Sequence, residues 1–261
     1  MKMNCGLLVV SFGTSYEQTR KNTIEAIEAD LGNAFPERKL YSAWTSSFIR
    51  KKVLKDEGIS ILSVEEALKK MTGDGIDDVL VQPTHMLCGT EFEQAAEVIS
   101  SFKDSFGKIR MGMPLLSAQE DIRGFALVLE NIFEMNKDRE MLALMGHGSA
   151  SSKLAVYDLL NDQFVLDGHP EICVGTVEFE PGIKPVLERV RERRPEKVFL
   201  TPMLIVAGDH ALNDMAGDEP GSWKNRILAE GTKVECIIKG LGEYKQIRDM
   251  YIEHARNCPA I

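Results

Sequence analysis

The nonapeptide LLVVSFGTS, residues 7–15, returns in altered form as ALMGHGSA at residues 143–150. Each copy is a short apolar run followed by a glycine turn and by residues that favour the start of a helix. The alignment pairs Phe12 with His147, Gly13 with Gly148 and Thr14 with Ser149. The chain therefore contains an internal repeat, and each half is predicted to begin with a strand, a tight turn and a helix.

Two further pairs of segments show the same repeat. VLVQPTHMLCGTE, residues 79–91, matches VFLTPMLIVAGDH, residues 198–210, and YSAWTSS, residues 41–47, matches VGTVEFE, residues 174–180, more weakly. The aligned positions are Pro83 with Pro202, Gly89 with Gly208, Glu91 with His210, and Thr45 with Glu178. Each match falls just past the end of a predicted strand, so the two halves share strands together with the loops that follow them.

Apolar runs alternate with amphipathic helical segments along the whole chain. The apolar runs are 7–10, 40–44, 79–82, 109–113, 142–145, 172–177, 198–203 and 234–238, and the helical segments are 17–31, 63–71, 91–106, 118–135, 184–194 and 244–255. Continuous apolar runs are typical of strands that are buried on both faces of a parallel sheet. The pattern predicts an α/β fold of two similar lobes, each a parallel β-sheet flanked by helices.

The length of 261 residues also fits two lobes, and the pattern places them at residues 1–125 and 126–261. Open parallel sheets bind ligands outside the carboxyl ends of their strands. Two such lobes that face each other would form one active-site cleft between them. The predicted architecture therefore directs attention to the loops that follow the strands.

Composition excludes several classes of function. A formal net charge of -9 argues against a nucleic-acid partner, and the one compact basic stretch, residues 189–194, alternates with glutamate. No apolar run approaches the roughly 18 residues of a membrane span, and the run Gly6 to Val10 is too short for a secretory signal. Five cysteines without a C-x-x-C pair fit no disulfide framework. We expect a cytoplasmic protein with no membrane partner.

Three polar residues of the second lobe follow predicted strands. His147 lies between two glycines, Glu178 follows the run at 172–177, and His210 lies in a loop that turns into a helix. Two imidazoles and a carboxylate form a donor set that suits Co, Ni, Fe or Zn without selecting among them. Each residue also has an ordinary structural reading: a turn histidine that caps a helix, an exposed strand-end carboxylate and a solvated helix residue. The residues alone leave both readings open.

The first lobe contributes a second set of candidates. Ser11 and Thr14 lie in the turn SFGTS, which resembles a loop that holds an anion at a helix N-terminus. Nucleotide fingerprints of the Walker or Rossmann type are absent from the sequence, whereas a flavodoxin-like flavin site would use a similar first loop. His85 follows a strand and is a candidate for ligand contact, with packing as the alternative. Glu91 occupies the position that repeats as His210.

Six segments resemble a known family: LLVVSFGTSY at 7–16, MGHGS at 145–149, VEFEP at 177–181, LIVAGDHALNDMAGDE at 204–219, GSWKNR at 221–226 and GLGE at 240–243. They are similar to the anaerobic-pathway sirohydrochlorin cobaltochelatases, a branch of the class II chelatases. The likeness covers nearly the whole chain, and the long run from residue 204 makes it specific. VEFEP departs from the family at Phe179 and Glu180, which puts contacts at the substrate rim in doubt.

The resemblance implies a chelatase-like fold and ATP-independent insertion of Co²⁺ into sirohydrochlorin, or the related precorrin-2, in cobalamin biosynthesis. It implies metal binding by His147, Glu178 and His210, and catalytic roles for His147, His210 and Glu91. Ser11, Thr14 and His85 are expected to contact the substrate. We expect no tightly bound cofactor, with Co²⁺ as the substrate metal and homo-oligomerisation left open.

Alternatives remain at this point. A chelatase of the same fold could use Ni²⁺ or Fe²⁺, because the ligand types do not discriminate these metals. A non-catalytic carrier of metal or tetrapyrrole would bind both without joining them, and a flavodoxin-like flavoprotein would be yellow when purified. Since the substrate carries several carboxylates, Arg50, Lys51 and Lys52 are candidates to bind it, with an ordinary helix-surface role as the competing interpretation.

Overall fold

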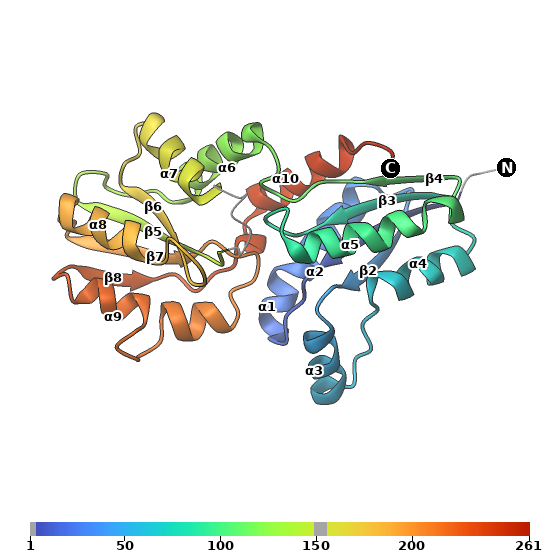
Figure 1. Cartoon of the computed structure of the whole chain (residues 1–261), viewed down its shortest axis with the longest axis horizontal. Coiled ribbons are helices and arrows are strands. Elements are labelled where there is room, and N and C mark those ends of the chain that lie inside the picture. Colours follow the sequence, from blue (N-terminus) through green and yellow to red (C-terminus); the bar gives the residue numbers. More distant parts are fainter. Residues whose placement is uncertain (1–3, 149–155) are drawn as a thin grey trace. The chain divides into compact units, whose positions relative to one another are not determined.

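The computed structural model of the chain describes residues 4–148 and 156–261 (Figure 1). It divides into two compact units. The first unit comprises Met1–Ser117 together with Lys245–Ile261, and the second comprises Ala118–Tyr244. Ser149, the counterpart of Thr14 in the repeat, lies outside the described residues.

The first unit is built on a four-stranded parallel sheet in the order β2-β1-β3-β4. Its strands are β1 (Cys5–Ser11), β2 (Lys39–Trp44), β3 (Asp78–Pro83) and β4 (Lys108–Met111). Its helices are α1 (Glu17–Asn22), α2 (Ile24–Ala34), α3 (Ser47–Glu57), α4 (Val64–Gly73), α5 (Thr90–Ser101), the short η1 (Lys103–Ser105) and α10 (Lys245–Arg256). Side chains of α4 and α5 bury one face of this sheet in a common apolar core.

The second unit repeats this topology with the order β6-β5-β7-β8. Its strands are β5 (Glu140–Gly146), β6 (Ile172–Thr176), β7 (Lys197–Pro202) and β8 (Lys233–Cys236). Its helices are α6 (Gln119–Ile132), α7 (Val156–Leu166), α8 (Lys184–Arg193), the π-helix η2 (Ala211–Met215), α9 (Trp223–Leu228) and the short η3 (Leu241–Glu243). In each unit the first strand lies between the second and the third, so the predicted pair of similar α/β lobes is confirmed.

The division of the chain differs from the expected bounds of 1–125 and 126–261. The second unit begins at Ala118, so residue 125 lies inside α6 rather than between lobes. The C-terminal helix α10 belongs to the first unit, where the fully buried Tyr251 donates a hydrogen bond of 2.8 Å to the carbonyl oxygen of Thr84. Arg248 also binds Asp30 of α2 at 2.7 Å. The two compact units therefore differ from the predicted bounds, because the apolar face of α10 packs on the first sheet.

Two expectations from composition can be compared with the described residues. None of the helices there combines the length and the apolar character that crossing a lipid bilayer requires. No disulfide joins the cysteines, all of which fall within the described ranges.

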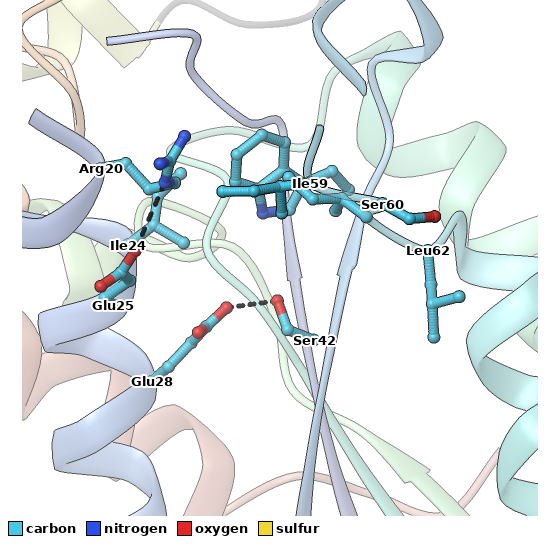
Figure 2. Close-up of a pocket in the computed structure, with 10 residues that line it drawn as sticks. Arg20, Ile24, Glu25, Glu28, Ser42, Ile59, Ser60 and Leu62 are labelled. Carbon is cyan, nitrogen blue, oxygen red and sulfur yellow. Dashed lines mark hydrogen bonds and ion pairs between the residues drawn. The ribbon is translucent and has the colours of Figure 1, made fainter. Parts of the chain in front are cut away.

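A pocket of about 350 Å³ lies in the first unit beside the edge strand β2 (Figure 2). Apolar side chains such as Ile24, Ile59 and Leu62 line it together with polar groups. Figure 2 shows Glu28 of α2 pointing toward Ser42 of β2, whose hydroxyl donates a hydrogen bond to the carboxylate. Burial raises the pKa of Glu28 to about 7, although this hydrogen bond opposes the shift. The pocket thus holds a carboxyl group that changes its charge near neutral pH.

Replacing this carboxyl group should change how stability depends on pH. Because the folded-state pKa of Glu28 lies above its ordinary value, the free energy of unfolding should fall as the pH rises from about 4.5 to about 7. Glu28→Gln should therefore stabilise the protein at pH 8 by up to about 3 kcal/mol more than it does at pH 5. Urea unfolding of both proteins at the two pH values measures this difference. Glu97→Gln, at an exposed position of α5, is the control, and an equal effect of Glu28→Gln at both pH values would contradict the expectation.

Candidate functional site

His147, Glu178 and His210 lie close together in the second unit, and we refer to them as the histidine–glutamate cluster. His147 Nδ1 is 4.0 Å from Glu178 Oε2, and His210 Nε2 is 3.9 Å from Glu178 Oε1. The two imidazole rings are 5.1 Å apart at an angle of 86°. These N···O distances are too long for hydrogen bonds, but an ion bonded at about 2.1 Å to each atom spans them. One ligand atom from each residue lies within 4.8 Å of the others, so the cluster can hold a metal ion.

The backbone after β5 and β6 brings His147 and Glu178 together. His147 is the first residue after β5, and Glu178 is the second residue after the neighbouring strand β6. The backbone N–H of Glu178 donates to the carbonyl oxygen of His147 at 2.8 Å, and that of Val177 donates to Gly146 at 2.8 Å. The two chain segments therefore continue side by side beyond the sheet, which fixes the distance between both ligands.

Gly148 makes this close approach possible. Its φ of 94° lies in the left-handed region, which a side chain disfavours. A Cβ atom built at this position would lie 1.8 Å from the carbonyl oxygen of Glu178. The backbone N–H of Gly148 also donates to the hydroxyl of the buried Tyr157 at 3.0 Å. The glycine is thus required both for its conformation and for the space that it leaves.

The loop after Glu178 is held by Thr176 at the end of β6. The Thr176 hydroxyl donates to the carbonyl oxygen of Phe179 at 2.9 Å and accepts from the backbone N–H of Gly182 at 2.9 Å. Phe179 itself has a φ of 62° and leaves 53% of its surface exposed. The segment that departs from the family pattern therefore presents an aromatic side chain to solvent, next to a metal-binding candidate.

His210 is positioned by the segment that follows β7 and leads into η2. Its Nδ1 lies 2.8 Å from Oδ2 of Asp214, while its Nε2 faces Glu178. Asp214 was not among the residues that the sequence pointed to. The available signal was the spacing of four residues between a histidine and an aspartate in a helical segment, which places both side chains on one face.

The predicted substrate-binding residues Ser11 and Thr14 lie in the first unit, at the end of β1 and just after it. Ser11 is buried, and its hydroxyl accepts a hydrogen bond of 2.9 Å from the Thr84 hydroxyl. The Thr14 hydroxyl, also in a buried residue, accepts from the backbone N–H of Tyr16 at 3.2 Å. Both hydroxyls therefore support the first loop itself, and their contact with substrate stays a prediction.

His85 and Glu91 belong to the loop and helix that follow β3. Both ring nitrogens of His85 are shielded from solvent and have no hydrogen-bond partner among the residues that the structure describes. Burial lowers the pKa of His85 to about 4, so its imidazole is neutral at neutral pH. Glu91 is exposed in the first turn of α5. The roles of both residues stay predictions.

The basic candidates Arg50, Lys51 and Lys52 lie on α3. Arg50 pairs with Glu66 at 3.4 Å, and Lys52 pairs with Asp56 at 2.7 Å. Lys51 is exposed. These contacts are typical of a solvated helix surface, and binding of substrate carboxylates by this helix stays a prediction.

Comparison with known proteins gives matches over almost the full length. Residues 5–259 match the family model described as "Cobalt chelatase (CbiK)". A relative from Salmonella typhimurium, named "Sirohydrochlorin cobaltochelatase", is 36% identical over 252 residues, which are 97% of this chain and 95% of the relative. A relative from Nitratidesulfovibrio vulgaris, named "Sirohydrochlorin cobaltochelatase CbiKC", is 28% identical and is matched over 95% of this chain and 88% of its own.

Among solved structures, SirB from Bacillus subtilis with Fe³⁺ has a similar fold. The TM-score is 0.63 at 14% sequence identity, and the match covers 97% of this chain and 95% of that chain. At this level of identity the likeness concerns the fold alone.

Proposed function

The chain belongs to the cobalt chelatase (CbiK) family, and from this premise we infer that it is a metal chelatase that inserts Co²⁺ into sirohydrochlorin for cobalamin synthesis by the anaerobic route. The observation that carries the proposal for this chain is the histidine–glutamate cluster. Within residues 4–148 and 156–261, it is the one group of three or more His, Cys, Asp or Glu residues whose ligand atoms lie close enough together to share a metal ion. The membership predicts the reaction, and the cluster supplies groups that suit it.

Insertion replaces two pyrrole protons with one divalent ion, so the site must handle both metal and protons. The balanced reaction is sirohydrochlorin plus Co²⁺ giving cobalt-sirohydrochlorin plus two protons. A neutral imidazole can bind a metal ion or accept a proton. We propose that His147, Glu178 and His210 bind Co²⁺ before its transfer, and that the histidines then take up the pyrrole protons. Glu91 is proposed to relay protons or balance charge.

The donor types favour release of the metal. Imidazole and carboxylate ligands suit first-row divalent ions, whereas thiolates bind the softer ones tightly. The cluster contains no cysteine. A site that must pass its metal to a macrocycle benefits from ligands that exchange, so the composition of the cluster fits transfer better than storage.

The remaining expectations are part of the same proposal. Since the cluster itself offers metal ligands and proton acceptors, we propose that no tightly bound cofactor takes part and that Co²⁺ enters only as a substrate. The sequence contains no Walker fingerprint, which fits insertion without ATP. We further propose a cytoplasmic location, while homo-oligomerisation is an open part of the proposal.

The metal preference can be tested by comparing initial rates. Sirohydrochlorin is mixed with catalytic amounts of the protein and with Co²⁺, Ni²⁺ or Fe²⁺, and the change in absorbance is followed beside protein-free controls. We expect the largest acceleration over the control with Co²⁺. A larger acceleration with Ni²⁺ or Fe²⁺ would assign the chain to the alternative metal, and equal rates with and without protein would contradict a chelatase.

A further inference from the structure

Among the residues that the structure describes, Asp214 places a carboxylate within hydrogen-bond distance of the histidine–glutamate cluster. Its Oδ2 lies 2.8 Å from Nδ1 of His210, which is a hydrogen-bond distance. On the other side of the same ring, Nε2 lies 3.9 Å from Oε1 of Glu178. The imidazole therefore has one nitrogen engaged by a carboxylate and the other directed at the remaining cluster ligands.

This arrangement selects one form of the imidazole. An ionised carboxylate only accepts hydrogen bonds, so the proton of the neutral His210 ring must lie on Nδ1. The lone pair of Nε2 is then free to bind a metal ion. The opposite tautomer would place a proton on the nitrogen that faces Glu178 and would block binding. A carboxylate behind a metal-binding histidine also makes the ring a stronger ligand.

The local fold holds the pair in place. His210 directly precedes the π-helix η2, and Asp214 lies within it. The side chains of Ala211 and Met215 in this helix are fully buried. The backbone N–H of Gly217 closes the segment by donating to the carbonyl oxygen of Asn213 at 3.1 Å. A Cβ atom at Gly217 would lie 2.2 Å from that oxygen, so a side chain there would force the segment to move. The buried side chains of Ala211 and Met215 fix one side of η2, so the side chains of His210 and Asp214 stay on its other side.

Within residues 4–148 and 156–261, no carboxylate lies within hydrogen-bond distance of the His147 ring. Among the residues that the structure describes, none forms a hydrogen bond with its ring, and its nearest charged neighbour is Glu178 at 4.0 Å from Nδ1. The carboxylate of Asp214 thus acts on one histidine of the cluster only. A surface ion pair between Asp214 and His210 does not by itself require Nε2 of His210 to face the other cluster ligands.

We propose that Asp214 is a positioning residue that orients His210 and fixes its proton on Nδ1, so that Nε2 binds the incoming divalent metal ion. This inference rests on the proposed function, because it assigns a role within the same site. Loss of such a partner behind a metal ligand typically costs about 10- to 100-fold in metal affinity. The effect should appear in metal binding and leave tetrapyrrole binding unchanged.

The test compares Asp214→Asn and Asp214→Ala with the wild-type protein. Binding of Co²⁺ alone is measured by equilibrium dialysis, and insertion is measured at varied Co²⁺ and varied sirohydrochlorin. We expect the Kd for Co²⁺ to rise about 10- to 100-fold, the KM for Co²⁺ to rise with it, and the KM for sirohydrochlorin to stay the same. The matched control is Asp218→Asn, which removes a fully exposed carboxylate paired with Lys224 from the same segment and should leave every value unchanged.

Two outcomes would overturn the proposal. One is a Kd for Co²⁺ within about twofold of the wild-type value in Asp214→Ala. The other is a rise in Kd for both variants that is matched by the control Asp218→Asn. An equal rise in the control would show that the loss of a negative charge near the site, and not the contact with His210, weakens Co²⁺ binding. The wild-type protein could also bind Co²⁺ more tightly than the Asp214 variants and yet insert none into sirohydrochlorin. That result would contradict the proposed function and leave this inference standing. Normal insertion by Asp214→Ala with unchanged Co²⁺ binding would contradict only the inference.

Discussion

Alanine at His147 or at His210 is expected to lower the rate of Co²⁺ insertion by on the order of 10²-fold or more, the usual scale for loss of a positioned acid or base. Each substitution removes one of the two imidazoles that are proposed to bind Co²⁺ and to accept a proton. Neither side chain is part of the buried core, since His147 is about half exposed and His210 about one-third exposed. The loss should therefore be one of activity and not of folding.

Initial rates at saturating sirohydrochlorin and Co²⁺ measure this effect, and thermal unfolding checks that each variant is folded. His254→Ala serves as the control, because this partly buried histidine of α10 hydrogen bonds to the carbonyl of Met113 and lies in the first unit. Full activity in either cluster variant would remove that histidine from the mechanism.

The second large effect is expected from Gly148→Ala. The new Cβ atom would lie only 1.8 Å from the Glu178 carbonyl oxygen, well inside van der Waals contact. Relief of this clash requires the 2.8 Å hydrogen bond between Glu178 and His147 to break or the two chain segments to separate. Either movement changes the spacing of the cluster ligands. We therefore expect insertion to fall by on the order of 10²-fold, as with loss of a ligand.

Gly168→Ala is the matched control for this substitution. Gly168 also has a positive φ, 82°, but a Cβ atom there would meet nothing within 4 Å. Its substitution should cost about 1–2 kcal/mol of stability through backbone strain alone and leave insertion unchanged. Equal loss of activity in both variants would show that strain, and not the clash at the cluster, is responsible.

The internal repeat allowed both the two-lobe fold and the histidine–glutamate cluster to be predicted from the sequence. Parallel strands end at one edge of a sheet, so residues just past β5 and β6 must lie near each other. His147 and Glu178 occupy those positions and were predicted on that basis. His210 lies eight residues beyond β7, and its approach to the cluster was suggested by the family resemblance and by its glycine-flanked loop. The structure then brings all three together.

Other features could not be predicted because they depend on packing between distant segments. The amphipathic pattern of residues 244–255 predicts a helix, but it does not tell which of two similar sheets will bury Tyr251. The turn SFGTS resembles a loop that holds an anion, whereas the hydroxyl of Ser11 accepts a hydrogen bond from Thr84, 73 positions away in the chain. Local pattern therefore predicted the strands and most of the longer helices but not α3, α7 or α9, and tertiary contacts determined these pairings.

The most direct test of the account is the number of product molecules formed per protein chain. Sirohydrochlorin and Co²⁺ are supplied in large excess over the wild-type protein, and the cobalt product is followed by absorbance to completion. The account predicts rapid conversion of many equivalents, far ahead of the protein-free reaction. Conversion that stops at one equivalent, or binding of both substrates without acceleration, would contradict it and would leave a carrier whose histidine–glutamate cluster only holds its ligand.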